Sequence, residues 1–444
     1  MKRNRRRLGM FVMAVTVMIL LVTFATGQAA KTITLTFWHH EAPAHRVAAM
    51  QKVIQMFEKA HPNIKLNQQV VMWGDAWPKT IASIQAGNTP DFQMSLPELT
   101  LVGNRMGAAL PVDDLIKELD KKYKFIKSQL APYYYEKHHW GVPIWTMPMT
   151  ILTYRPSYLE KYAGTSEPPK TWDELLAMAK KLTVDTDNDG KIDIYGIGLT
   201  AGNNLCTQEQ VYTFMAAAGA TMFDAKGNLT FNSAQTKKAI QFYADLFKFA
   251  PPGATGWLWG ELELNFGAGS VAMMPYFGTL QKRFYDMKSF DYAAVPMPYP
   301  AGGKSAGLIY PNDITIYKAA QKRGHLKAVK DFVRFVSRPD INAILTAGAE
   351  PGGFVPVTEA ATKDKAYWNN PIIAKFKELN ETIISTIPNG KLYGFEHGSL
   401  ANFGVGDISG ANIIAEAAQK VVTGSATVDQ AVEWATAEIK KLMK

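Results

Sequence analysis

Strand-like and helix-like segments alternate along the chain after residue 30. Residues 32–38 place isoleucine, leucine and phenylalanine at every second position, which is the period of a β-strand. Residues 47–57 then carry apolar side chains at the three- and four-residue spacing of a helix, and the apolar run at 64–72 is typical of a second strand. A further helix and a further strand follow before residue 96. Because strands joined through helices run parallel, this alternation predicts a parallel sheet covered by helices.

The α/β pattern continues to the end of the chain. Thr171 and Glu174 have the spacing of a capping box, in which each side chain satisfies a free backbone amide near the other, so we predict a helix that follows Thr171. Helical periodicity also predicts helices at about residues 233–249, 326–336 and 427–442. With 444 residues, 47% of them hydrophobic, the chain is large enough for two or three domains with filled cores.

Residues 1–30 have the composition of an export signal. A head of five basic residues precedes the apolar segment 8–24, and small residues follow up to Ala30. We therefore expect a signal peptide over residues 1–30 that is cleaved, and a periplasmic or secreted protein. A retained membrane anchor is the alternative, but the apolar segment is near the lower length limit for crossing a bilayer. Cys206 is the only cysteine, so we expect neither a lipid-anchor cysteine nor an intrachain disulfide.

The net charge does not indicate nucleic-acid binding. The formal charge is +9, but five basic residues and no acidic residue lie in the first 30, which leaves +4 for the rest of the chain. Lysine and arginine there are interleaved with aspartate and glutamate, as in residues 117–124, so no stripe of one sign can follow a phosphate backbone. We therefore expect no nucleic-acid partner.

Several short motifs spread over nearly the whole chain point to one receptor family. They lie at residues 57–65, 85–91, 141–143, 153–155, 171–175, 187–191, 269–274 and 353–357. In their order and spacing the chain resembles the family 1 extracellular solute-binding proteins, the maltose-binding-protein-like sugar receptors of ABC transporters. The resemblance implies an α/β, two-lobed periplasmic-binding-protein fold of type II, in which each lobe is a mainly parallel sheet flanked by helices and hinge crossings join the lobes.

The resemblance also implies a division of the chain and a function. Residues 31–148 and 271–311 are expected to form lobe I, and residues 149–270 and 312–444 are expected to form lobe II. The cleft between the lobes would hold a sugar or oligosaccharide, and the receptor, a monomer, would deliver it to the transmembrane permease subunits of an ABC importer. Those subunits are expected to be separate chains, because the sequence after the signal has neither a membrane span nor a nucleotide-binding loop.

A sugar receptor needs flat aromatic side chains for the apolar faces of the sugar, with amides and carboxylates around them for its hydroxyl groups. Because ligands of open α/β sheets lie beyond the carboxyl ends of the strands, the best candidates follow predicted strands. In the first half of the chain they are Trp38, His39, Trp73, Asp75, Trp77, Glu98 and Trp145. For each tryptophan a packing role in the core is the alternative, and Asp75 would alternatively cap the helix that follows it.

A second set of candidates lies in predicted loops and crossings of the later chain. Glycine-rich or strand-end positions favour Asn203, Trp257, Trp259, Glu261, Tyr276, Tyr310, Asn312, Asp313 and Gly353. The aromatic residues among them would stack on sugar rings, the polar ones would bond hydroxyl groups, and Gly353 would let the backbone approach the ligand.

One acidic loop has the spacing of a calcium site. Asp185, Asp187, Asp189 and Asp193 match positions one, three, five and nine of a calcium-binding loop, and Lys191 would contribute its backbone carbonyl. Gly196 stands where such loops carry a bidentate glutamate. Two interpretations remain open: a structural Ca²⁺ whose shell is completed by water or another residue, and a solvated aspartate-rich turn without a metal.

No motif indicates an enzyme or an organic cofactor. Neither a dinucleotide loop nor a phosphate-binding loop with its lysine is present in the sequence. A secreted glycoside-active enzyme is the alternative function, because carboxylates and tryptophans also line the clefts of glycosidases. The resemblance along the whole chain favours the receptor.

Overall fold

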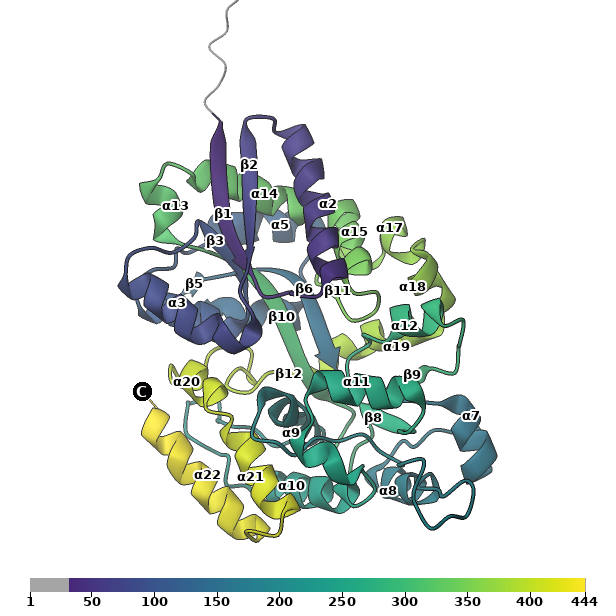
Figure 1. Cartoon of the computed structure of the whole chain (residues 1–444). Coiled ribbons are helices and arrows are strands. Elements are labelled where there is room, and N and C mark those ends of the chain that lie inside the picture. The colour runs from purple at the N-terminus through teal and green to yellow at the C-terminus, as the bar shows by residue number, and fades with distance from the viewer. Residues whose placement is uncertain (1–31, 444) are drawn as a thin grey trace, which may run out of the picture.

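The computed structural model describes residues 32–443, which form two lobes that meet along two long strands, β6 (Val142–Met149) and β10 (Gly307–Ile316) (Figure 1). In Figure 1 the first lobe contains the purple strands near the N-terminus, and the second lobe ends in the yellow C-terminal helix. The signal peptide expected at residues 1–30 lies outside the described residues. No helix of the described part combines the length and the apolar character that crossing a membrane requires.

The first lobe is built on a seven-stranded sheet. Its strands lie in the order β11-β6-β10-β3-β1-β2, and β12 pairs with β10. The strands not yet defined are β1 (Ile33–His39), β2 (Ile64–Val70), β3 (Phe92–Ser95), β11 (Val355–Pro356) and β12 (Gly390–Lys391). β1 pairs in parallel with β2 and β3, as the sequence pattern predicted, whereas β10 runs antiparallel to both β3 and β6.

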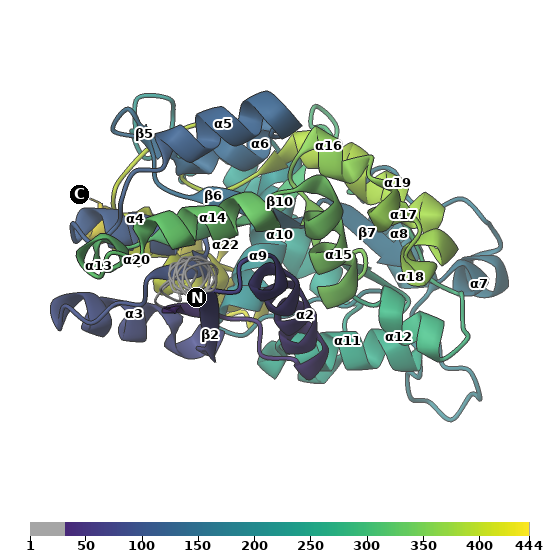
Figure 2. The ribbon, with the colours of Figure 1, turned by 90° about the horizontal axis from the view of Figure 1, so that it is seen from above.

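Helices cover this sheet because its apolar side chains need partners on both faces. They are α2 (Ala44–Ala60), η1 (Trp73–Asp75), α3 (Ala76–Gln85), α4 (Pro97–Arg105), α5 (Asp113–Tyr123), α6 (Lys127–Leu130), η2 (Ala131–Tyr133), α13 (Lys318–Lys322), α14 (Leu326–Val336), α15 (Pro339–Ala349), α16 (Glu359–Thr362) and α17 (Lys365–Trp368), with the hairpin β4 (Tyr134–Tyr135) and β5 (His138–His139). Seen from above, α14 lies between α2 and α5 (Figure 2). Its Phe332 packs near the stacked rings of Phe37 and Phe92, whose centroids are 4.8 Å apart.

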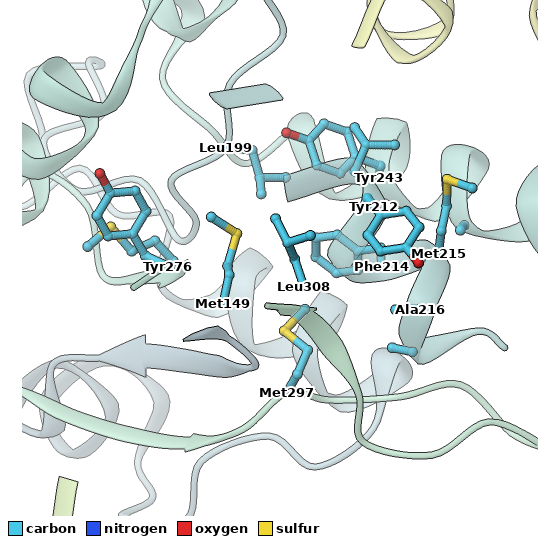
Figure 3. Close-up of a cluster of buried hydrophobic side chains, with 14 of the residues drawn as sticks. Met149, Leu199, Tyr212, Phe214, Met215, Ala216, Tyr243, Tyr276, Met297 and Leu308 are labelled. Carbon is cyan, nitrogen blue, oxygen red and sulfur yellow. The ribbon is translucent and has the colours of Figure 1, made fainter. Parts of the chain in front are cut away.

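The second lobe has a small sheet of its own, in the order β8-β7-β9, formed by Met273–Pro275, Ile151–Tyr154 and Ala293–Pro296. All pairs in this sheet are antiparallel, so the mainly parallel sheet expected for this lobe is not what the structure contains. Buried apolar side chains surround the sheet, and Figure 3 shows Met149 and Leu308 in this cluster beside Phe214.

Helices form most of the second lobe. They are α7 (Pro156–Tyr158), η3 (Leu159–Ala163), α8 (Trp172–Lys181), α9 (Leu205–Ala217), α10 (Ala234–Phe247), η4 (Pro252–Gly256), α11 (Trp259–Ala268), α12 (Gln281–Asp286), α18 (Pro371–Lys375), α19 (Lys377–Thr386), η5 (Ile387–Asn389), α20 (Val405–Gly410), α21 (Ile413–Val422) and α22 (Val428–Leu442). The capping box predicted at Thr171 and Glu174 is present at the start of α8, and α14 has the predicted bounds.

The chain is divided between the lobes differently from the expected boundaries. Residues 271–311 were expected in lobe I, but β8 and β9 pair with β7 in the second lobe, and the return to the first lobe is made by β10. Residues 312–444 were expected in lobe II, but α14 and α15 pack on β1 and α2 of the first lobe. Short apolar strands look alike in sequence, and which sheet takes them depends on partners far away in the chain.

Candidate ligand-binding cleft

A cavity of about 440 Å³ lies between the two lobes. Its lining residues come from the ends of strands of the first lobe, from α9 and α11, from the segment after β8, and from the two long strands. They are His40, Glu41, Ala42, Pro43, Arg46, Met72, Trp73, Gly74 and Leu96; Leu205, Glu209, Trp259, Glu263, Tyr276, Phe277 and Thr279; and Met147, Tyr310 and Asn312. This is the position beyond the carboxyl ends of the strands where ligands of α/β sheets bind.

A larger groove, of about 950 Å³, lies elsewhere on the molecule. It is lined by parts of α5, α6 and residues near 384–398, and no strand of the large sheet ends in it. The smaller cavity combines aromatic rings with several converging carboxylates, which is the composition of a small-molecule site. We therefore take the 440 Å³ cavity as the candidate site and name it the cleft.

The wall of the cleft formed by the first lobe carries two aromatic rings in contact. The rings of His40 and Trp73 are 4.4 Å apart, between centroids. His40 Nδ1 lies 2.8 Å from the Val71 carbonyl oxygen, and the Gln93 amide lies 2.9 Å from Nε2, so Nδ1 donates and Nε2 accepts. Burial lowers the pKa of His40 to about 4, which keeps the ring neutral.

An arginine at the start of α2 holds two carboxylates beside this wall. Arg46 donates from Nη1 to Glu41 at 2.6 Å and from Nε to Glu350 at 2.8 Å. Burial raises the pKa of Glu41, and the guanidinium charge of Arg46 opposes that rise. The guanidinium group therefore forms ion pairs with two carboxylates of the protein: Glu41, which lines the cleft, and Glu350, which is not part of the lining.

The second lobe presents an indole and a carboxylate that are bonded to each other. Trp259, at the start of α11, donates from Nε1 to Glu209 Oε2 of α9 at 2.8 Å. Burial raises the pKa of Glu209 to about 8, so its neutral form is favoured in the empty cleft. The bond fixes the orientation of the indole plane.

A second carboxylate lies one helical turn further along α11. Glu263 Oε1 accepts from the Thr279 hydroxyl at 2.7 Å and from the Tyr276 hydroxyl at 3.1 Å. Burial raises the pKa of Glu263, and the nearby Glu350 adds to the rise. Trp259 and Glu263 lie on the same face of the helix because they are four residues apart.

The long strand β10 supplies the floor of the cleft. The Tyr310 hydroxyl is hydrogen-bonded to the Tyr393 hydroxyl, and Asn312 Nδ2 donates to the Tyr310 carbonyl oxygen at 3.2 Å. Because β10 reaches both lobes, this floor lies where the lobes join.

The structure brings five of the predicted site residues together. Trp73, Trp259, Tyr276, Tyr310 and Asn312 line the cleft. They come from both lobes and from the strand that joins them, as a site between lobes requires.

Several predicted aromatic candidates lie outside the lining. Trp38 and Trp145 are buried; Trp38 Nε1 donates to Gln69 at 2.9 Å, and Trp145 stacks on Phe354. Trp77 packs against the small cluster of Ala76, Leu99 and Val102, and Trp257 packs against the core of the second lobe. These four tryptophans therefore have the packing role that was considered as the alternative to ligand binding.

The polar candidates outside the lining are either exposed or fully buried. Asp75 is exposed and makes no side-chain bond to the helix it precedes, so it is not the cap considered as the alternative. Asn203 bonds Glu416 at the surface, and Glu261 accepts from the Leu258 amide at 3.0 Å. His39 is buried beside the strand that carries its partner Gln68.

Three further candidates are buried behind the cleft. Glu98 has no exposed surface, and burial raises its pKa to about 7. Asp313 is equally buried; it accepts from Thr100, and burial raises its pKa to about 8. Gly353 is buried where an added Cβ would lie 2.5 Å from the Cγ of Glu350, so close packing accounts for the glycine.

The sequence reasoning did not select four charged lining residues, Glu41, Arg46, Glu209 and Glu263. Glu41 and Arg46 follow the first strand within a few residues, so the strand-end rule that selected His39 also applied to them. Glu209 and Glu263 lie within helices, and the face that a helix turns to another lobe is not visible in a local pattern.

The acidic loop predicted as a calcium site brings its carboxylates together at the surface. Oxygen atoms of Asp185, Asp187 and Asp193 lie within 4.8 Å of one another. Asp189 accepts from the Lys191 amide at 2.8 Å and from Lys191 Nζ at 3.3 Å. A ring of carboxylate oxygens fits a hard cation.

Comparisons with known proteins agree with this architecture. The chain is 25% identical over 423 residues to the putative ABC transporter periplasmic-binding protein YcjN of Escherichia coli strain K12, which covers 93% of each chain. Among solved structures, maltose-bound MalE3 of T. maritima superposes with a TM-score of 0.76 at 18% identity, covering 93% of this chain and 100% of that one. A sugar transporter protein of Arthrobacter chlorophenolicus with bound laminaribiose gives 0.75 at 21% identity, with coverages of 93% and 100%.

The sequence model of one family matches a continuous part of the chain. It is described as bacterial extracellular solute-binding protein, and it matches residues 43–343, which is more than half of the chain. The match includes Trp73 and Arg46 on the first-lobe side of the cleft, α9, α11 and β10. The chain therefore belongs to the bacterial extracellular solute-binding proteins, a family of receptors rather than enzymes.

Proposed function

We propose that this receptor binds a sugar or oligosaccharide in the cleft and delivers it to the permease subunits of an ABC importer. The observation that carries the proposal is the cleft itself, in which Trp73 and Trp259 of opposite lobes accompany Glu41, Glu209 and Glu263. Indole rings stack on the apolar faces of sugars, and carboxylate oxygens accept from sugar hydroxyl groups. The similar structures that hold maltose and laminaribiose support the same ligand class.

The binding mode follows from the two walls. Groups of both lobes contact a ligand together only when the lobes are closed, so the ligand binds the closed form more tightly and shifts the population toward it. The permease then recognises the closed receptor. In this proposal residues 1–30 are a cleaved signal peptide, and the exported protein works as a monomer outside the cytoplasm.

A panel of neutral mono- and oligosaccharides, including maltose, laminaribiose and cellobiose, tests the proposal. Melting temperature, tryptophan fluorescence and product release are measured on the purified protein. We expect a saturable fluorescence change and a rise in melting temperature with at least one sugar, because a ligand that binds only the folded state stabilises it. Hydrolysis of the bound sugar would favour the glycoside-active enzyme instead.

We further propose that the acidic loop holds a structural Ca²⁺. The clustering of Asp185, Asp187 and Asp193 carboxylate oxygens within 4.8 Å supports this. Two such carboxylates about 4 Å apart repel by roughly 1 kcal/mol in water, and a divalent cation removes that repulsion. The loop lies apart from the cleft lining, so the ion would stabilise the second lobe without touching the sugar.

A further inference from the structure

Most side-chain hydrogen-bond donors of the cleft are already occupied. Five lining side chains donate to acceptors of the protein itself: His40, Arg46, Trp259, Tyr276 and Thr279. The acceptors that receive these bonds are mostly the carboxylates of the cleft, so few side-chain donors remain for a ligand.

The acceptors of the cleft, by contrast, are only half used. Glu209 accepts through Oε2, and Glu263 accepts both of its bonds through Oε1. Within residues 32–443, Oε1 of Glu209 and Oε2 of Glu263 have no partner in the protein. Both residues line the cavity, so these oxygen atoms are available to a ligand in the cleft.

The charged residues of the lining are mostly acidic, which also favours a ligand that donates hydrogen bonds. Glu41, Glu209 and Glu263 line the cleft, and Arg46 is its only arginine or lysine among the described residues. The guanidinium of Arg46 is also shared with Glu350, 2.7 Å away, so it does not balance the carboxylates that face it. Among the described residues, neither Glu209 nor Glu263 forms a salt bridge, so two carboxylic acids of the second lobe lie in the cleft without a directly bonded basic group.

A neutral sugar fits such a cleft incompletely. Each of its hydroxyl groups donates one hydrogen bond but also brings oxygen lone pairs that need donors. A protonated amine donates three hydrogen bonds and accepts none, and a bond from an ionised donor to a carboxylate is stronger than a neutral one. Building on the sugar-binding function proposed above, we propose that the cleft prefers a saccharide bearing a protonated amine, which donates to Glu209 and Glu263.

The ionisation behaviour of the two acids agrees with this assignment. Burial raises the pKa of both Glu209 and Glu263, and at Glu263 the charge of Arg46 opposes this rise without cancelling it. An ammonium group beside either acid supplies a positive charge and favours the ionised form of the acid. The aromatic rings of Trp73 and Trp259 also attract a cation placed over their faces.

Matched pairs of sugars that differ only in amines replacing hydroxyl groups test the preference. Glucose and glucosamine, galactose and galactosamine, and cellobiose with its diamino analogue are titrated into the full protein by calorimetry at about pH 7. The N-acetylated form of each amine completes the set. We expect the amine to bind at least about tenfold more tightly than its neutral partner, and N-acetylation to abolish the gain, since it removes the charge.

Two variants locate the effect. Glu209→Gln and Glu263→Gln keep the side-chain volume and remove the acceptor charge. Each should weaken binding of the amine about tenfold more than it weakens binding of the neutral partner, because the amine loses a charge-assisted hydrogen bond and the neutral sugar loses a weaker one. Glu433→Gln, the same change at an exposed position of α22, is the matched control and should change neither.

The outcomes separate the inference from the function on which it rests. If neutral sugars bind as tightly as their amines, the amine preference is wrong and the sugar receptor stands. If both variants weaken neutral and amino sugars equally, the two acids bind hydroxyl groups and the preference is again wrong. If neither neutral nor amino sugars raise the melting temperature, the sugar-binding function itself fails.

Discussion

At the scale of single residues, the two indoles of the cleft have different supports. Trp259 is held by its bond to Glu209, whereas Trp73 is held by contact with the His40 ring. Both rings are only partly buried, so each has a face left for a ligand. Such aromatic side chains dominate the binding energy of small sites.

Truncation of either ring therefore weakens sugar binding. We expect Trp73→Ala and Trp259→Ala each to lower the affinity for a bound sugar by at least about 1 kcal/mol, because a stacked ring contributes about that much. Calorimetric titration measures the change. Trp434→Ala, which removes a partly buried indole of α22 outside the cleft, is the control. Unchanged affinity in both cleft variants would show that the rings do not contact the ligand.

The raised pKa of Glu209 predicts a pH-dependent stability. In the unfolded chain its pKa is near 4.5, and in the folded protein it is about 8, so the folded state binds one more proton between these values. The contribution of Glu209 to the free energy of unfolding is therefore fully present below about pH 4.5 and is lost as the pH rises toward 8.

Thermal unfolding between pH 5 and pH 8 measures this effect. The free energy of unfolding should fall by up to about 1.4 kcal/mol per pH unit through this group, and the fall should be smaller in Glu209→Gln. Glu98 and Asp313 act in the same direction, so only the difference between the two proteins isolates Glu209. Identical pH profiles would contradict the raised pKa.

The strand-end rule found part of the site from the sequence. It selected Trp73, Tyr310 and Asn312 because each follows or lies on a strand that reaches the cleft. It also selected Trp145, which lies on such a strand but faces the core and Phe354 instead. In a strand, neighbouring side chains face opposite sides, so the rule fixes the place of a residue but not the direction of its side chain.

At the scale of elements, the sequence correctly predicted features that depend on residues close together in the chain. The helix at 326–336 and the cap at Thr171 depend on periodicity and on neighbours in sequence, and both are present as predicted. The apolar side chains of residues 195–199 also indicate a strand in the sequence, but the segment forms only an isolated bridge between Tyr195 and Val271. Gly198 donates to the carbonyl oxygen of Met273 in β8 at 2.7 Å, so the segment lies along β8 without forming a regular strand.

The Ca²⁺ proposed for the acidic loop would make the stability of this element depend on a ligand of its own. A chelator should lower the melting temperature of the second lobe, because a bound ion at about 100 times its dissociation constant stabilises the folded state by about 2.7 kcal/mol. Sugar affinity should stay the same, since the loop does not line the cleft. Asp187→Asn, which removes one carboxylate charge, should reproduce the effect of the chelator. A melting temperature that is insensitive to both would favour the turn without a metal.

At the scale of the whole molecule, the two-lobed architecture followed from the resemblance, but the division of the chain did not. Residues 271–296 carry the apolar strands that complete the small sheet with β7, and α14 and α15 return to cover the large sheet. These partners are more than a hundred residues apart in the chain. Which lobe a segment joins is decided by contacts with segments far away in the chain, and local sequence patterns do not reveal these contacts.

The lobes also touch behind the cleft. Arg105 of α4 donates to the Phe403 carbonyl oxygen at 3.0 Å and lies 3.2 Å from Asp407 of α20. The pair is partly exposed, so it contributes at most about 1 kcal/mol to holding the lobes together. In the proposed function the ligand decides closure, through the difference between its affinities for the closed and the open form.

Ligand-driven closure is measurable on the whole protein. A saturating sugar should reduce the radius of gyration in small-angle X-ray scattering, because the lobes move together around it. The Trp73→Ala and Trp259→Ala variants should require a higher sugar concentration for the same reduction, since each lacks the aromatic contact of one lobe with the ligand. A scattering curve that stays constant while calorimetry shows saturation would place the ligand on one lobe alone. That outcome would contradict closure and leave binding intact, because the two measurements report different steps.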